Sequence, residues 1–174
     1  VADITEDKAH LYLWVPNALI VEGLETMRRW GFTYKTNLVW YKVRKDGGPD
    51  GRGVGFYFRN VTELVLFGVK GSNNRTLSAG RRQVNLLSTQ KREHSRKPDE
   101  FYNIVESCSP GPYIELFCRH PRKGWDAWGN EIPFVGEVYP QHEIAKQLAF
   151  FEKSVVRRVK KATAFSSQQQ KDKK

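Results

Sequence analysis

Residues 93–130 read EHSRKPDEFYNIVESCSPGPYIELFCRHPRKGWDAWGN, and the rest of the chain is best interpreted outward from this stretch. Residues 97–100 (KPDE) predict the start of a helix, because proline suits the first turn and acids favour the positive end of the helix dipole. Residues 109–112 (SPGP) end that helix, and residues 113–118 predict a strand. The predicted helix has one apolar face, made by Phe101, Ile104, Val105 and Cys108. This turn–helix–strand unit is suited to holding a small polar ligand at the carboxyl end of the strand.

The residues before this unit alternate between strand and helix patterns. Aromatic and apolar runs predict strands over residues 10–15, 33–43 and 62–69. Apolar residues at helical spacing predict a helix over residues 18–30, with Asn17 as its N-cap and Gly31 just beyond its end. The strand–helix–strand order implies a parallel crossover and therefore an α/β fold.

Three segments carry little regular pattern. Residues 44–55 are rich in glycine and predict a loop, either a lid or a segment that grips substrate. Their glycines lack the strand-to-helix context of a phosphate-binding loop. Residues 70–96 are polar and basic, with a short apolar break at residues 84–87, and residues 132–140 also predict a loop.

Length and composition predict one folded domain with a tail. The chain has 174 residues, 39% of them hydrophobic, including five tryptophans. Cys108 and Cys118 fit neither a disulfide framework nor a zinc site, which indicates buried thiols in a reducing compartment. We expect the cytoplasm in a prokaryote and the nucleus in a eukaryote, with no membrane partner. Because the first residue is valine, we expect a processed product or a fragment of a longer protein.

Positive charge is concentrated in two segments. Residues 70–97 hold eight Lys or Arg against one acid, residues 141–174 hold nine against three, and the remainder sums to −3. This distribution is typical of a protein that binds a polyanion, whereas the alternative is a solvated loop and a solubilising tail. The candidate nucleic-acid-binding residues are Lys70, Arg75, Arg81, Arg82, Lys91, Arg92 and Arg96.

The C-terminal residues predict a helix and a disordered end. Apolar positions at helical spacing favour an amphipathic basic helix over residues 141–162, which docks either on its own domain or on a partner. Residues 163–174 are low in complexity and predict a disordered tail. The expected organisation is an α/β domain over residues 1–140, this helix, and the tail.

The sequence offers few side chains for covalent or metal catalysis. The four histidines lack metal-ligand spacing, and no nucleophile elbow occurs. Glu115 lies in an apolar strand, where burial demands a partner: either a ligand or backbone contact, or an ion pair with Arg119 or another base. Trp125 and Trp128 flank Asp126 in a predicted short loop, either over a flat ring or as core residues. A ligand site at a strand end is the remaining interpretation.

Eight short motifs, in order along residues 11–132, resemble one enzyme family. They are Leu13-Trp14-Val15, Trp30-Gly31-Phe32, Val39-Trp40-Tyr41-Lys42, Phe67-Gly68-Val69-Lys70-Gly71, residues 94–100 (HSRKPDE), Ser109-Pro110-Gly111, residues 114–119 (IELFCR) and Trp128-Gly129-Asn130. This order resembles the S-adenosylmethionine-dependent adenine-N6 methyltransferases related to the eukaryotic mRNA adenosine methyltransferase. The compact spacing is similar to bacterial and phage members.

The resemblance implies a Rossmann-like methyltransferase sheet in the permuted amino-methyltransferase order, incomplete at its N-terminus, and S-adenosylmethionine as cofactor. It assigns the methionine part to the turn and helix start at residues 94–100, with Lys97 near the carboxylate; a helix N-terminus and an ammonium both favour an anion. It assigns Arg119 to the ribose and Asn130 and Glu131 to ribose and adenine, although Glu131 replaces the glutamine of the mRNA enzyme. The candidate cofactor-binding residues are His94, Ser95, Lys97, Glu115, Phe117, Arg119, Asn130 and Glu131.

One family motif is absent from these residues. No Asp-Pro-Pro-Trp occurs in the sequence, and in the family this motif holds the target adenine amine by positioning and electrostatics. In family order it lies upstream of residue 1. The sequence therefore leaves three hypotheses: an adenine-N6 methyltransferase acting on DNA in preference to RNA, a non-catalytic nucleic-acid-binding or scaffolding subunit beside a homologous partner, and an α/β domain of unrelated function.

Overall fold

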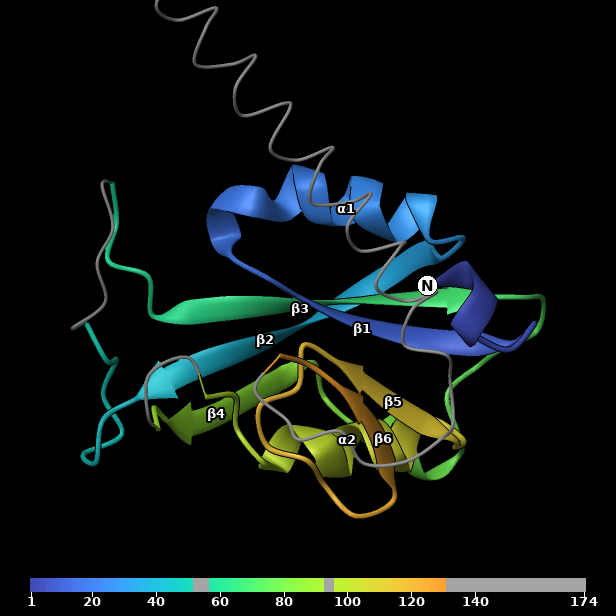
Figure 1. The fold of residues 1–174 in the computed structure, drawn as a ribbon. Coiled ribbons are helices and arrows are strands. Elements are labelled where there is room, and N and C mark those ends of the chain that lie inside the picture. Colours follow the sequence, from blue (N-terminus) through green and yellow to red (C-terminus); the bar gives the residue numbers. More distant parts are fainter. Residues whose placement is uncertain (52–56, 93–95, 131–174) are drawn as a thin grey trace, which may run out of the picture. The chain divides into compact units, whose positions relative to one another are not determined.

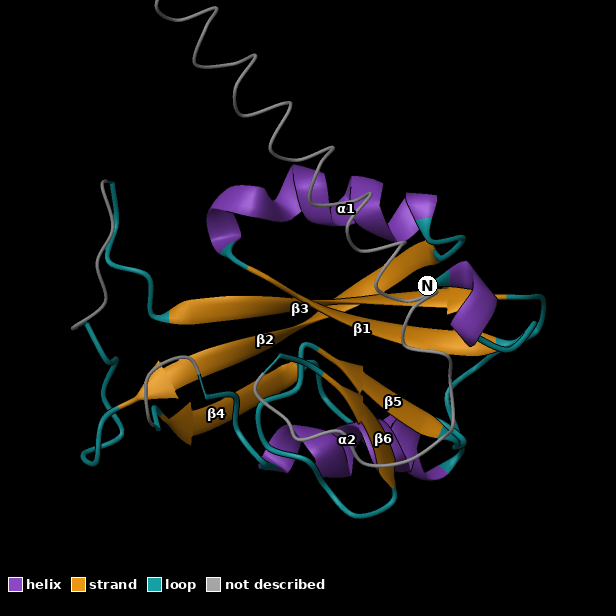
Figure 2. Cartoon of the chain, viewed as in Figure 1, coloured by secondary structure: helices purple, strands orange, loops and turns teal. Residues whose placement is uncertain are grey.

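The computed structural model describes residues 1–51, 57–92 and 96–130. Its elements, drawn in Figures 1 and 2, follow in the order η1 (Ala2–Ile4), β1 (Ala9–Val15), η2 (Asn17–Leu19), α1 (Ile20–Arg29), β2 (Thr33–Val43), β3 (Thr62–Lys70), η3 (Ala79–Arg82), β4 (Leu86–Gln90), α2 (Glu100–Cys108), β5 (Tyr113–Leu116) and β6 (Trp125–Trp128). The predicted helix over residues 141–162 and the predicted tail lie outside the described residues.

Two sheets are formed, and the larger one is mixed. Its four strands lie in the order β1-β3-β2-β4, while β5 and β6 pair separately in parallel. β3 is antiparallel to both of its neighbours, and β4 is parallel to β2. β1 and β2 therefore run in the same direction, as the strand–helix–strand order predicts. The predicted parallel crossover from β1 through α1 to β2 is confirmed, and β3 lies between the two strands and pairs with both.

Two strands were not predicted. β4 lies in the basic segment where the sequence gives no pattern, since only Leu87 and Thr89 alternate inward within its five residues. β6 replaces the short loop expected around Asp126. Trp125 is partly buried and packs against the core cluster, stacked on Tyr113 with ring centroids 4.8 Å apart. Both strands are short enough that their pairing partners, rather than their own alternation, decide their conformation.

α1 covers one face of the large sheet. Met27 of α1 is fully buried and packs directly over Gly68 of β3. A Cβ added to Gly68 would lie 2.6 Å from the sulfur of Met27. Gly31 ends the helix with φ +84°, as predicted for a residue in the left-handed region. The predicted N-cap is wrong: η2 precedes the helix, and the amide nitrogen of Asn17 instead donates to the carbonyl oxygen of Thr62 at 3.2 Å.

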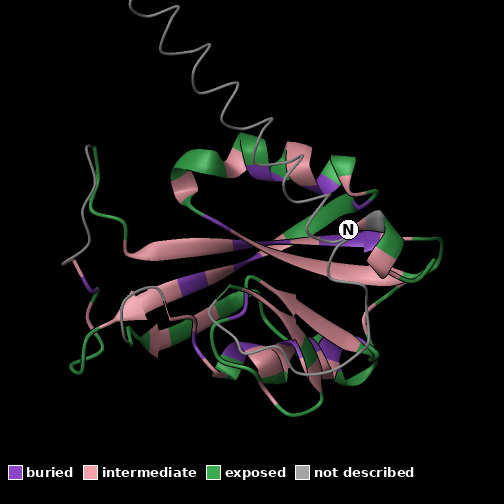
Figure 3. Cartoon of the chain, in the orientation of Figure 1, coloured by how far each residue is buried: buried purple, intermediate pink, exposed green. Residues whose placement is uncertain are grey.

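α2 packs on the opposite face, where the main core lies. Phe101 and Val105 of the predicted apolar face are buried against Leu38 of β2 and Val65 of β3. Figure 3 shows buried positions on α2 and on strands of the large sheet. Ile104 packs at the margin of the same cluster. The face predicted from helical spacing is therefore confirmed, and it fixes α2 against the centre of the large sheet.

A polar network joins the end of α2 to the start of β1. Ser109 is buried, and its hydroxyl lies 2.7 Å from Nδ1 of His10 and 2.8 Å from the hydroxyl of Tyr12. The hydroxyl of Tyr113 donates to the carbonyl of Ser109 at 2.8 Å. His10 thus has a structural place, and burial lowers its pKa, which favours the neutral ring.

The described ranges contain no helix long and apolar enough to cross a membrane. Within the same residues, no group of His, Cys, Asp and Glu side chains is arranged to hold a metal ion.

Candidate functional site

The first part of the site is the shared carboxyl end of β5 and β6. The two strands are parallel, with Leu116 opposite Trp128, so the residues that follow each strand lie at the same edge. Cys118 continues the pairing by donating from its backbone nitrogen to the carbonyl of Trp128 at 2.9 Å. This arrangement brings Phe117 and Arg119 to the same end as Asn130. Three of the predicted cofactor-binding residues thus gather where parallel strands leave their polar ends available.

Phe117 has an unusual backbone. Its φ is +63°, a conformation that bulky residues rarely adopt, and its side chain is 62% exposed. The ring contacts Trp128 edge-on, with centroids 5.6 Å apart. The left-handed turn directs an aromatic ring outward at the strand end, and such local strain is often associated with ligand sites.

Gly129 lets the two strand ends approach closely. A Cβ at this position would lie 2.1 Å from the carbonyl oxygen and 2.9 Å from the nitrogen of Cys118. Both are backbone atoms that are fixed by the pairing between the strands. Only glycine fits here, and it immediately precedes Asn130.

We expect Gly129→Ala to lower the free energy of unfolding by about 1–3 kcal/mol, the usual cost of overpacking, and to displace Asn130 from the strand end. Gly51→Ala is the matched control, because an added Cβ there meets nothing within 4 Å. Urea denaturation of both variants measures the difference. Equal stabilities would show that β6 can move away from Cys118 without loss.

The N-terminus of α2 faces the same edge. The hydroxyl of Tyr102, in the first turn, donates to Glu115 of β5 at 2.7 Å, while the C-terminal end of the helix lies at the start of that strand. α2 is therefore antiparallel to β5. Its N-terminal end, which begins at Glu100, therefore lies toward the end of β5 that Phe117 follows.

The carboxylate of Glu115 is hydrogen-bonded within the protein, to the hydroxyl of Tyr102. The sequence left open a ligand or backbone contact and an ion pair with Arg119 or another base; the hydrogen bond from the Tyr102 hydroxyl is none of these. Burial, with the hydrogen bond and charge of Glu115, raises the pKa of Tyr102. Burial also raises the pKa of Cys118 to about 11, with Glu115 adding to it. The thiol is protonated at neutral pH, so Cys118 is not an activated nucleophile.

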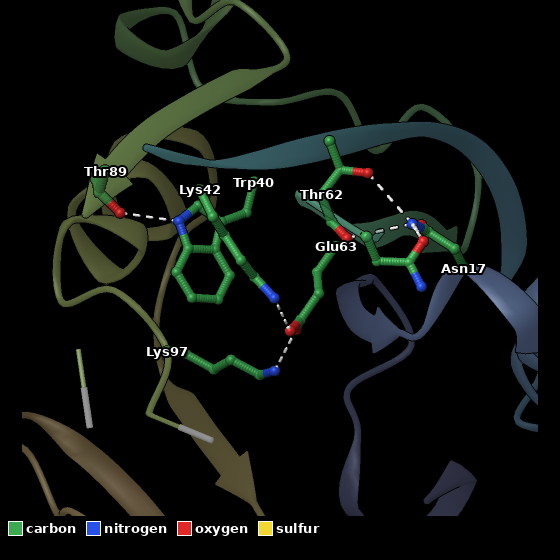
Figure 4. Close-up of polar contacts among 8 residues, drawn as sticks. Asn17, Trp40, Lys42, Thr62, Glu63, Thr89 and Lys97 are labelled. Carbon is green, nitrogen blue, oxygen red and sulfur yellow. Dashed lines mark hydrogen bonds and ion pairs between the residues drawn. The ribbon is translucent and has the colours of Figure 1, made fainter. Parts of the chain in front are cut away.

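The second part of the site is a carboxylate held by two lysines, drawn in Figure 4. Glu63 of β3 accepts from Nζ of Lys42 on β2 at 2.6 Å, and its other oxygen accepts from Nζ of Lys97. Burial alone would raise the pKa of Glu63, but hydrogen bonds and charges from Lys42 and Lys97 outweigh it, so the pKa lies below its usual value. Glu63 is therefore ionised at neutral pH.

Two indole rings surround these charges. The ammonium of Lys97 lies 4.8 Å from the Trp14 ring centroid, and that of Lys42 lies 4.8 Å from the Trp40 ring centroid. Trp40 is fixed by a hydrogen bond from its ring nitrogen to Thr89 at 2.8 Å (Figure 4). Ammonium groups at this distance from an indole face gain cation–π stabilisation. The site thus combines ionic and aromatic surfaces.

Sequence reasoning missed Glu63 and Lys42 as functional candidates. The signal was present, because Glu63 opens an otherwise apolar strand, the argument that singled out Glu115. What the sequence does not reveal is that β3 lies beside β2. That pairing sets Glu63 opposite Trp40 and diagonal to Lys42 on the α2 face.

The predicted nucleic-acid-binding residues divide into two groups. Arg92 pairs with Asp99 and Glu100, and Arg96 pairs with Asp99, so these two cations are partly neutralised by the first turn of α2. Lys70 donates to the hydroxyl and carbonyl of Thr5. Arg75, Arg81, Arg82 and Lys91 are exposed. The exposed group is the better candidate for phosphate contact. His94, Ser95 and Glu131 lie outside the described residues.

With this geometry in place, the comparisons with known proteins identify the family. The MT-A70 family model matches residues 1–131. The chain belongs to the MT-A70 family. The family match covers the large sheet, α2 and the β5–β6 edge, and thus both parts of the site.

Named relatives include both bacterial and animal methyltransferases. The type II methyltransferase M.MunI of Mycoplasma sp is 33% identical over 135 residues, covering 76% of this chain and 54% of that protein. The human N(6)-adenosine-methyltransferase catalytic subunit METTL3 is 30% identical over 141 residues, covering 79% of this chain and 24% of that protein. The Drosophila melanogaster MT-A70-like protein is 30% identical over 140 residues, covering 78% and 23%. The chain thus spans about half of the bacterial relative and about a quarter of the animal ones.

Proposed function

We propose that the protein transfers the methyl group of S-adenosylmethionine to N6 of adenine in nucleic acid, with DNA preferred over RNA. The observation that carries the proposal is the shared carboxyl end of β5 and β6, with the first turn of α2 bonded to β5 through Tyr102 and Glu115. A helix N-terminus and an ammonium suit a carboxylate, whereas an exposed aromatic ring and polar side chains suit a nucleoside. The preference for DNA rests on the compact motif spacing, which is similar to that of bacterial and phage members of the family.

In this proposal S-adenosylmethionine supplies an electrophilic methyl group, and the chain binds and orients it. Lys97 pairs with the methionine carboxylate, together with His94 and Ser95. Phe117 packs on the adenosine, and Arg119, Asn130 and Glu131 bind its polar groups. Glu115 acts through Tyr102, by fixing α2 against β5. The acceptor adenine approaches beside Glu63, which is bonded to Lys97.

The Asp-Pro-Pro-Trp motif that would hold the acceptor amine is absent from the 174 residues, and we place it in a segment beyond them. The strand order leaves strand edges at which a further strand could pair. β1 is the outermost strand of its sheet, and β5 has one edge with no partner among the described residues. A strand edge of this kind accepts another strand through backbone hydrogen bonds.

Methyl transfer from radiolabelled S-adenosylmethionine to adenine-containing DNA and RNA oligonucleotides tests the proposal on the intact protein. We expect label in N6-methyladenine, with more in DNA than in RNA. Calorimetric titration with S-adenosylmethionine provides the independent binding measurement. Absence of binding heat together with absence of label would remove the enzyme interpretation.

A non-catalytic scaffolding subunit is the second candidate. The observation that favours it is the exposed basic group Arg75, Arg81, Arg82 and Lys91, because nucleic-acid binding by such residues needs no acceptor motif. It predicts nucleic-acid binding with no cofactor heat. Tight binding of S-adenosylmethionine would argue against it.

The exposed basic residues give a prediction about salt dependence. Affinity falls as salt concentration rises, and replacing Arg81 and Arg82 by glutamine should make this fall shallower. The magnitude of the slope of log affinity against log salt concentration should decrease by roughly 1.4–1.8, since each phosphate contact contributes about 0.7–0.9. The matched control replaces Arg28 and Arg29, which both pair with Glu25 on α1. Filter binding to a DNA oligonucleotide at several salt concentrations measures the slopes. Identical slopes in both double variants would exclude η3 from the phosphate interface.

A further inference from the structure

Glu63 is shared by two lysines that come from different parts of the fold. One carboxylate oxygen binds Lys42 at 2.6 Å and the other binds Lys97 (Figure 4). Neither contact is required for strand pairing, because the backbone of Lys42 already donates to the carbonyl of Val61 at 2.8 Å. The two side-chain contacts are therefore free to have separate roles.

The two lysines are not equivalent. Lys42 and Glu63 stand on adjacent antiparallel strands in fixed register, so the distance between them is set by the sheet. The Lys42 side chain is 12% exposed, against 36% for Lys97. Lys97 lies in the segment just before α2, and its side chain reaches from there to Glu63 on β3. An anion that competes for one of these lysines would draw Lys97 away more readily than Lys42.

Glu63 can lose its contact with Lys97 without becoming an unpaired charge, because Lys42 stays bonded to it. Its carboxylate is partly buried, and an unpaired charge there would be costly. Lys42 remains bonded to one oxygen, and the Lys42 ammonium is itself held over the Trp40 ring. Loss of Lys97 therefore leaves Glu63 ionised and in place, with one oxygen open.

We propose that Lys97 exchanges Glu63 for the carboxylate of the bound cofactor, and that Lys42 is the positioning residue that keeps Glu63 fixed during the exchange. The inference rests on the proposed function. The released oxygen of Glu63 then accepts a hydrogen bond from an amino group of the acceptor base. Cofactor binding and acceptor binding are thereby coupled through one ammonium group.

Two cofactor analogues isolate the carboxylate. S-adenosylhomocysteine carries the amino-acid carboxylate, whereas 5′-methylthioadenosine occupies the same nucleoside position without it. Saturating the intact protein with either one blocks the cofactor pocket, so that adenosine 5′-monophosphate reports on the acceptor position. We expect adenosine 5′-monophosphate to bind at least about fivefold more tightly with S-adenosylhomocysteine than with 5′-methylthioadenosine, the lower end of ordinary coupling between sites.

Three variants identify the groups responsible. In Lys97→Met the difference between the two analogues should disappear, because the Glu63 oxygen is open in both complexes. In Lys42→Met the fivefold gain should be lost at a higher pH than in the unaltered protein, because Glu63 loses its remaining cation and protonates more easily. Lys42→Arg keeps the charge and should restore the gain, which a purely structural role for the lysine stem would not produce.

The outcomes separate this inference from the proposed function. If S-adenosylhomocysteine binds but affinity for adenosine 5′-monophosphate is the same with both analogues, the exchange is wrong and the cofactor site stands. If the gain survives in Lys97→Met, the coupling runs through other residues and the exchange is again wrong. If S-adenosylhomocysteine itself does not bind, the proposed function fails first.

Discussion

Replacing Phe101 by alanine should lower the free energy of unfolding by about 3–5 kcal/mol, the range expected for removing a buried aromatic side chain from a packed core. Phe101 is 7% exposed and links α2 to the large sheet. Its ring lies 5.0 Å from Trp14 and 5.8 Å from Tyr12, measured between centroids. The cavity would open between the helix and β1, beneath the residues that hold Lys97.

Phe101→Leu is the matched control, because it retains most of the apolar volume and should cost less than about 1.5 kcal/mol. Urea denaturation followed by tryptophan fluorescence measures both variants. A loss below about 1 kcal/mol for the alanine variant would mean that α2 is not anchored by this ring. The cofactor edge would then have to be organised by β5 and β6 alone.

Replacing Lys97 by methionine should weaken S-adenosylmethionine binding by roughly 10- to 150-fold, because a hydrogen bond to a charged group contributes about 1.5–3 kcal/mol. Methionine keeps the stem near Trp14 while removing the ammonium. The free energy of unfolding should change by less than about 1 kcal/mol, since the ion pair with Glu63 is partly exposed and Lys42 still holds the carboxylate.

Two controls restrict the interpretation of that loss. Lys35→Met removes the same charge from an exposed position on β2 and should leave cofactor affinity unchanged. The affinity of the Lys97 variant for 5′-methylthioadenosine should also match that of the unaltered protein, because this analogue has no carboxylate. Calorimetry with both ligands decides the matter: equal losses for the two would move Lys97 away from the carboxylate and toward a general structural role.

The local elements followed from residue patterns wherever apolar spacing was strong. The apolar face of α2 is confirmed by the burial of Phe101, Val105 and Cys108, and Gly31 ends α1 as predicted. Asn17 shows the limit of such reasoning. Its side chain suits an N-cap, but Thr62 lies within reach only after β3 has paired with β1, and the tertiary contact replaced the local one.

In the candidate site, too, some residues were predicted from the sequence, whereas some of their contacts became visible only in the structure. Lys97, Phe117, Arg119 and Asn130 were assigned to the cofactor by the resemblance to the family, whose motifs stand in the same order along the chain. The roles assigned to them in cofactor binding remain predictions. Arg92 and Arg96 were predicted from charge alone, and their pairing with Asp99 and Glu100 became visible only when α2 was placed.

Short-range spacing and motifs in linear order were enough to predict the family, α1, α2 and the strands β1, β2, β3 and β5. The position of β3 between β1 and β2 became visible only in the folded structure, and this position joins Glu63 to Lys42 and Lys97. The physical reason is that strand pairing satisfies backbone hydrogen bonds between residues far apart in the chain, a choice that no local pattern encodes.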